Sequence, residues 1–334
     1  MKKSYFLMAA AATMFAACSQ SDVLNEVQVQ EEAQAIGFST YSNKSTRAIA
    51  DTDLEKYHET FGVWAFKTYD GTETTVMPNY QVNKPAAGDE TWVYANVGTQ
   101  ELKYWDKRAS YTFCAYAPYA SGVAIDGASK VISIPNGQYA ANENLQESFS
   151  EALNTNDFTG VGGNVDNAST DWMVADVISR GVKENGLVVE NFRHTMAKLI
   201  VCFKTEDDFE DAITLNSVSV NNVRGTGSYN SATGWTATGA AKSISGVPGE
   251  IVKGKTYYSM EYLLIPSNDA PNFSVNYTIN GDTYDVKSEA ITGINRFDAN
   301  TVYTLTVTIS ADPIEFDATV VDWQYNVSGS VTIE

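Results

Sequence analysis

Histidine is scarce in this sequence. Only His58 and His194 occur among 334 residues, and neither has a histidine four positions away or a nearby cysteine, so no metal site is recognisable. The Gly-x-Ser-x-Gly nucleophile elbow and the phosphate-binding loop are also missing. We therefore expect no enzyme, no cofactor, no metal ion and no catalytic residue, although two catalytic carboxylates on distant strands would leave no local pattern.

Positive charge is in short supply as well. The chain has 22 lysines and arginines against 41 aspartates and glutamates, which gives a formal net charge of -19. Binding to phosphates needs a basic surface, so we exclude nucleic acid as a partner. We interpret the acidic surface as a source of solubility and of resistance to non-specific association.

Cysteine is limited to three residues, Cys18, Cys114 and Cys202. The last two lie inside apolar, strand-like runs, YTFCAYAPY and KLIVCFK. Export from the cytoplasm would permit a disulfide between them. Two buried free thiols fit the sequence as well, and we favour this second interpretation.

Long apolar runs are missing after the start of the chain. Lys2 and Lys3 precede the run YFLMAAAATMFAA, which is too short to span a bilayer permanently. The run ends at Cys18 in FAACSQSD, which resembles a bacterial lipobox, the motif whose cysteine receives lipid. We predict a signal peptide over residues 1–18 with lipidation at Cys18, which would hold the precursor on a membrane. A plain secretory signal cut nearby is the alternative.

Short runs with a period of two dominate the rest of the chain. Residues 271–280 and 301–310 alternate apolar and polar side chains and are rich in β-branched and aromatic residues, a pattern typical of half-buried strands. The sequence therefore predicts an all-β protein with mostly antiparallel sheets arranged as sandwiches. A polar, glycine-containing stretch at 179–191 is the expected domain boundary.

The two ends of the chain also have strand patterns. Residues 36–41 form a predicted short strand with Ile36 and Phe38 on one face. In the final residues the apolar set is Tyr325, Val327, Gly329, Val331 and Ile333, and polar residues alternate with it. Such a terminal strand can close its own domain as an edge strand, or it can add to the sheet of another molecule.

Several motifs in this order resemble those of a known family. They are the lipoprotein signal ending at Cys18, FSTYSNKSTRA with its arginine, FGVWAF, NFRHTMAKLIVCF, ANTVYTLTVTI, and VVDW near the end. Together they cover essentially the whole chain, and they resemble the fimbrillin family. Its members are the pilin precursors of the type V pili of anaerobic Gram-negative bacteria.

The resemblance implies two tandem transthyretin-like β-sandwich domains with Greek-key-type antiparallel sheets. It places a propeptide with a removable strand at residues 19–47, an N-terminal domain at 48–185 and a C-terminal domain at 186–334. The last 20 residues or so, from about 314 to 334, would serve as a donor strand for a neighbouring subunit.

The resemblance also implies a life history. The precursor would be exported, lipidated with palmitate at Cys18 and carried to the outer membrane. An arginine-specific protease would then cut between Arg47 and Ala48. Other pilin subunits would be its partners, because Tyr325, Val327, Val331 and Ile333 of one subunit would fill the vacated groove of the next. The expected product is a stalk subunit of an extracellular fimbrium that contributes to cell adhesion and biofilm formation.

Two other functions fit the composition. One is a surface lipoprotein or tip adhesin that binds glycan or host protein through exposed aromatic side chains such as Trp92, Trp105 or Trp235. The other is a secreted β-sandwich hydrolase, for which the sequence nominates no pair of carboxylates.

Overall fold

Every secondary-structure element whose bounds the computed structural model defines is a β-strand. The structure describes residues 34–40, 54, 58–86, 91–95, 100–138, 140–141, 158–161, 171–206, 211–309 and 315–322. The predicted all-β class is confirmed. Among the described residues, no helix is long and apolar enough to cross a bilayer.

Seven strands between residues 60 and 194 form one antiparallel sheet in the order β13-β10-β5-β2-β3-β4, in which β11 also pairs with β5. Its members are β2 (Thr60–Tyr69), β3 (Thr72–Asn83), β4 (Val93–Tyr94), β5 (Ser110–Ala117), β10 (Met173–Ala175), β11 (Ile178–Arg180) and β13 (Phe192–His194). Asp70 and Gly71 join β2 to β3 with positive φ at both positions, the geometry of a two-residue hairpin turn.

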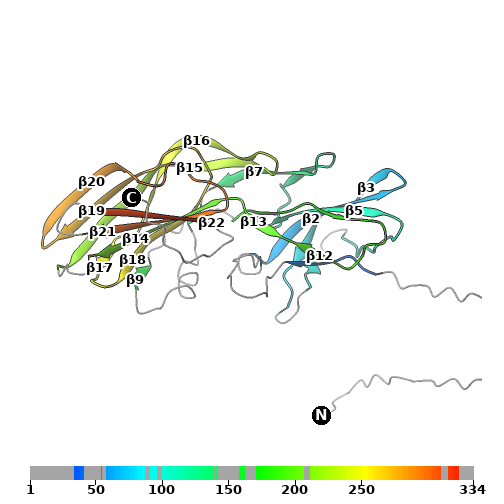
Figure 1. Ribbon diagram of the computed structural model, residues 1–334, viewed down its shortest axis with the longest axis horizontal. Coiled ribbons are helices and arrows are strands. Elements are labelled where there is room, and N and C mark those ends of the chain that lie inside the picture. The colour runs from blue at the N-terminus through cyan, green and yellow to red at the C-terminus, as the bar shows by residue number, and fades with distance from the viewer. Residues whose placement is uncertain are drawn as a thin grey trace, which may run out of the picture. The chain divides into compact units, whose positions relative to one another are not determined.

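Two further sheets lie mainly in the second half (Figure 1). One has the order β22-β21-β14-β18-β8, with β9 on β18, and the other has the order β20-β19-β15-β7-β6, with β16 and β17 on β15. The first contains β8 (Ala140–Ala141), β9 (Phe158–Val161), β14 (Ala197–Thr205), β18 (Thr256–Leu264), β21 (Thr301–Ile309) and β22 (Glu315–Asp322). The second contains β6 (Ala124–Asp126), β7 (Val131–Gln138), β15 (Ile213–Asn230), β16 (Gly234–Ser245), β17 (Gly249–Ile251), β19 (Asn272–Ile279) and β20 (Asp282–Ala290).

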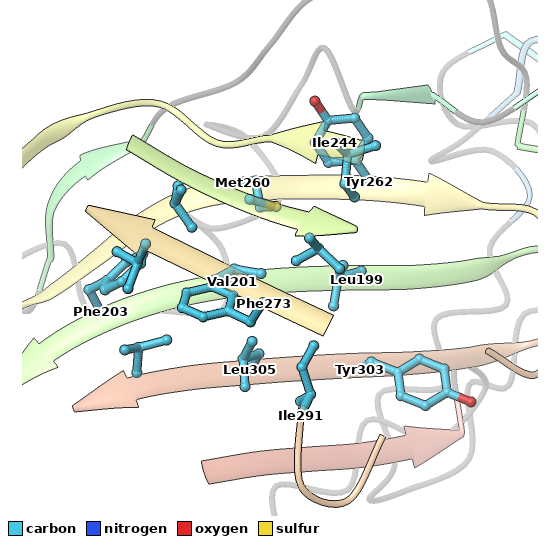
Figure 2. Packing of buried hydrophobic residues seen from close by; sticks show 14 of the residues in the cluster. Leu199, Val201, Phe203, Ile244, Met260, Tyr262, Phe273, Ile291, Tyr303 and Leu305 are labelled. Atoms are coloured by element: carbon cyan, nitrogen blue, oxygen red, sulfur yellow. The ribbon is translucent and has the colours of Figure 1, made fainter. Parts of the chain in front are cut away.

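A hydrophobic cluster drawn from residues 197–318, which we call the C-terminal core, joins these two sheets. The predicted alternation holds in β19 and β21, where every second side chain is buried. Figure 2 shows Val201 of β14, Phe273 of β19 and Leu305 of β21 gathered in this core. The period-two pattern therefore identified the faces that pack together.

A second cluster, the N-terminal core, draws on residues 36–192 and lies against one face of the first sheet. A third joins side chains such as Trp64 and Tyr116 to Leu263 and Ile265. β7 comes from the first half of the chain but pairs with β15. The boundaries at 48–185 and 186–334 stay predictions.

Cys114 on β5 and Cys202 on β14 are both buried and free, so the interpretation as unpaired thiols is confirmed. Burial raises the pKa of Cys114 to about 12 and that of Cys202 to about 11. Both thiols are therefore protonated and unreactive at neutral pH.

Candidate strand-binding site

A short N-terminal strand is built into the first half of the structure. This strand, β1 (Gly37–Thr40), pairs in parallel with β12 (Leu187–Glu190). Main-chain groups of residues 92–105 bind the same segment: Ile36 N donates to Lys103 O at 2.8 Å, Trp105 N to Gln34 O at 2.9 Å, and Trp92 N to Phe38 O at 2.9 Å. We call residues 34–40 the plug strand and the residues around it the strand site.

The plug strand fills the N-terminal core with two side chains. Ile36 is 1% exposed and Phe38 is fully buried, so the predicted face of this strand is confirmed. The Phe38 ring lies edge-on to Phe61 at 5.8 Å and to Phe113 at 6.0 Å between ring centroids. Such edge-to-face contacts stabilise aromatic clusters beyond the area that they bury.

The opposite face of the plug strand is closely covered at one point. A Cβ atom at Gly37 would lie 2.8 Å from Leu187 Cδ2, so any larger residue at this position would have to displace the leucine. Leu187 is 44% exposed, so its side chain can rotate away, and the close contact at Gly37 does not by itself require a small residue there.

A glutamate lies at the end of the strand site. Glu190 is fully buried, and among the described residues neither of its carboxyl oxygens has a hydrogen-bond partner. Its register partner on the plug strand is Thr40. Burial raises the pKa of Glu190 to about 8; nearby Arg180 opposes this shift and Asp176 adds to it. The Arg180 guanidinium donates through Nη2 to Leu187 O at 3.3 Å instead.

The predicted processing and donor residues lie outside the described residues. These are Cys18, Arg47, Ala48, Tyr325, Val327, Val331 and Ile333, and each role stays a prediction. Within the predicted donor segment, β22 is described and pairs antiparallel with β21. The plug strand ends at Thr40, and Arg47 follows seven positions later in the sequence (47 − 40 = 7).

Sequence reasoning missed Glu190 and the residues that line the strand site. The signal was present in LVVENF (187–192), where Val188, Glu190 and Phe192 alternate with exposed or half-buried neighbours. A carboxylate at an inward position of a strand is unusual enough to notice.

The two histidines of the chain lie near one aspartate. His194 Nδ1 is 2.8 Å from Asp171 Oδ2. Burial lowers the pKa of His58, and the charge of Asp171 acts in the opposite direction. Within the described ranges, no group of three or more histidine, cysteine, aspartate or glutamate side chains is placed to hold a metal ion.

Two of the tryptophans expected to bind glycan are not exposed. Trp92 is 1% exposed and Trp105 is 7% exposed, because both pack into the N-terminal core. Trp235 is half-buried, and its Nε1 donates to Thr195 O at 2.6 Å. The expectation of an exposed aromatic surface at Trp92 and Trp105 is wrong, because both side chains pack inside the N-terminal core.

Comparisons with known proteins give one family and one fold. The sequence profile of the fimbrillin-like family matches residues 46–323. No curated protein matches the chain.

Solved structures share its fold over most of its length. A fimbrial protein from Bacteroides vulgatus has a TM-score of 0.58 at 15% identity, covering 87% of this chain and 99% of that one. A putative cell adhesion protein from Bacteroides uniformis has a TM-score of 0.54 at 17% identity, covering 89% and 100%.

Proposed function

This chain belongs to the fimbrillin-like family, and from that premise we propose that it polymerises by strand exchange after cleavage between Arg47 and Ala48. The family consists of fimbrial structural proteins, not enzymes, which assemble with other fimbrial subunits at the cell surface. The finer steps, from lipid anchor to donor strand, are our proposal for this chain.

The plug strand is the observation that carries the proposal. Its main chain bonds to residues 92–105 and β12, and its side chains enter the N-terminal core. Loss of residues 34–40 would leave unpaired main-chain groups beside the aromatic rings of Phe61 and Phe113. An open sheet edge above an apolar trench captures another strand.

The energy available to a new strand is substantial. Burying side chains such as Ile36 and Phe38 gains about 1.5–3 kcal/mol each, and main-chain hydrogen bonds add to this. A strand donated by a second subunit recovers what cleavage removes. Head-to-tail contacts of this kind do not close on themselves, so they propagate as a filament.

The predicted donor is the C-terminal segment, with Tyr325, Val327, Val331 and Ile333 as its inward side chains. β22 ties the start of this segment to β21, and 12 residues follow Asp322 in the sequence (334 − 322 = 12). In an extended conformation, 12 residues reach about 40 Å, which is ample for a site that the plug strand fills with seven residues. A subunit with such a segment fits a stalk position, since it has something to donate.

Lipidation at Cys18 would hold the precursor on the outer membrane, and cleavage at Arg47 would release the lipid and the plug strand together. Residues 1–47 contain four positive and four negative side chains, so the remaining 287 residues (334 − 47) keep the net charge of -19. Such a surface resists lateral association of filaments. The mature subunit is thus suited to an extracellular fimbrium.

Cleavage of the purified precursor tests this function. An arginine-specific protease should yield a chain that begins with Ala48 and forms high-mass polymers in size-exclusion chromatography with light scattering. Arg47→Lys is the matched control: it should resist that protease and stay monomeric, yet polymerise after trypsin treatment. Polymerisation of Arg47→Ala to the extent of the parent would refute the cleavage step.

The donor is tested separately in the same assay. Deletion of residues 325–334 should leave cleavage intact and abolish polymer growth. Normal growth by this variant would remove the C-terminal segment from the proposal while leaving the cleavage step in place.

A further inference from the structure

Glu190 is an unusual component of a hydrophobic core. A buried carboxyl group normally has hydrogen-bond partners, because an unsatisfied one is costly in a low-dielectric environment. Glu190 is fully buried, and neither of its side-chain oxygens is hydrogen-bonded in the part of the chain that the structure describes. Its position therefore needs an explanation beyond packing.

The position of Glu190 within the strand site offers such an explanation. Val188 is paired with Phe38, and Glu190 is paired with Thr40 two positions further on in the same parallel register. Paired residues on adjacent strands point to the same face of a sheet. The side chain at plug position 40 therefore lies on the same face as the Glu190 carboxyl group, next to it across the ladder.

The charged neighbours do not satisfy the carboxyl group. Arg180 and Asp176 are the charged side chains that act on Glu190 electrostatically. Arg180 directs its Nη2 to Leu187 O at 3.3 Å, and its buried Nε has no hydrogen-bond partner. Asp176 carries the wrong charge to help. The Cys114 thiol on β5 is also within electrostatic reach of Glu190, but neither Glu190 oxygen is hydrogen-bonded to it or to any other described residue. Thr40 is the register partner of Glu190 on the plug strand, and a longer side chain at that position could supply the missing donor.

We infer that Glu190 forms a selectivity subsite of the strand site, which takes a hydrogen-bond-donating side chain from the incoming strand. The favoured strand carries two large apolar residues on its inward face, and then a lysine or asparagine-like donor opposite Glu190. This inference rests on the proposed strand exchange. The plug strand meets the apolar requirement with Ile36 and Phe38 but leaves the subsite unsatisfied. An incoming strand that satisfies it is bound more tightly than the plug strand that it replaces.

A double-mutant cycle on the intact chain tests the subsite without cleavage or assembly. Thr40→Lys and the shorter Thr40→Asn should raise the midpoint of thermal unfolding by about 2–4 °C. Thr40→Val, which has the shape of threonine without its hydroxyl, should leave the midpoint unchanged. In the Glu190→Gln background, the gain from lysine should fall below about 1 °C.

Equal gains from lysine or asparagine with and without Glu190 would overturn the inference, and so would no gain from either. The pH dependence provides a second measurement if Glu190→Gln folds poorly. The midpoint of the parent should fall as the pH rises from about 4.5 towards 8, and Thr40→Lys should flatten this fall. An unchanged slope in Thr40→Lys would count against the subsite.

A binding assay separates this inference from the proposed function. Protein cleaved at Arg47 is mixed with fluorescent peptides of residues 34–40 that end in threonine, valine or lysine. The lysine peptide should bind about tenfold more tightly than the valine peptide, and only when Glu190 is present. If no peptide binds, cleavage does not open the site, and strand exchange fails. If all three bind equally, strand exchange stands and the subsite fails.

Discussion

Two buried glutamates, Glu190 on β12 and Glu261 on β18, have different surroundings. Glu261 on β18 is 1% exposed, and its Oε1 lies 2.6 Å from Lys198 Nζ on the neighbouring strand β14. Glu190 is equally buried, but its side-chain oxygens have no hydrogen-bond partner within the described part of the chain. The sheet of β14 and β18 thus pairs its buried carboxyl group with a cation, whereas the described structure leaves the carboxyl group on β12 without a hydrogen-bond partner beside the plug strand.

The two cores differ in the same way. All buried members of the C-terminal core come from residues 197–318. The N-terminal core depends on Ile36 and Phe38, which lie in the segment that we propose is removed. Under the proposed strand exchange, one core is permanent, and the other depends on which strand occupies it.

Truncating one phenylalanine in each core should produce the largest effect. Phe38→Ala and Phe273→Ala should each lower the free energy of unfolding of the intact chain by about 3–5 kcal/mol, because both rings are fully buried. After cleavage at Arg47 and removal of the N-terminal segment, only Phe273→Ala should still differ from the parent. Urea unfolding before and after cleavage measures this, and a persistent Phe38→Ala effect would contradict the division into two kinds of core.

Removing the partner of Glu261 should be nearly as costly. Lys198→Met keeps the aliphatic stem but leaves a buried carboxylate without its cation, which we expect to cost about 3 kcal/mol. Pairing it with Glu261→Met should recover most of the loss, since two apolar side chains can replace a buried ion pair. Denaturant midpoints of the two single variants and the double variant would show whether this pair is coupled.

Replacing Glu190 should raise the stability of the intact chain, in contrast to the replacement of Lys198. Glu190→Met takes away an unsatisfied buried carboxyl group, so the intact chain should gain about 1–3 kcal/mol at neutral pH. Glu190→Gln is the control for shape, and it should gain less because an unsatisfied amide remains. A clear loss of stability in Glu190→Met would mean that this carboxyl group contributes to the intact fold.

The pH profile should separate the contributions of two buried titratable groups. The raised pKa of Glu190 gives stability that is full below about pH 4.5 and is lost as the pH rises through 8, with a slope of at most about 1.4 kcal/mol per unit. The lowered pKa of His58 acts in the other direction, and stability is lost as the pH falls below 6.5. Glu190→Gln should remove the alkaline loss alone, and His58→Gln the acid loss alone.

Local patterns were sufficient to predict the faces of individual strands. The alternation in β19 and β21 identified their buried sides, and that of residues 36–41 placed Ile36 and Phe38 inward, because burial imposes a period of two. Pairing between distant segments left no such pattern. The fold brings Thr40 next to Glu190, and it brings His58 and His194 close to Asp171. These residues lie too far apart in the sequence for a local pattern to show it. The interpretation of Arg47 came from the resemblance, because an arginine in a polar stretch has no distinctive local pattern.

In the proposed filament, β22 would also carry tension between subunits. It pairs with β21 at eight positions, and β21 pairs in parallel with β14 at nine. In a filament joined through the segment after Asp322, a pull along the strands loads these hydrogen bonds together in shear, whereas a pull across the sheet would break them one after another. Detachment then requires a whole ladder to fail at once, so the mechanical lifetime of each link is set by the length of the strands rather than by the size of the core.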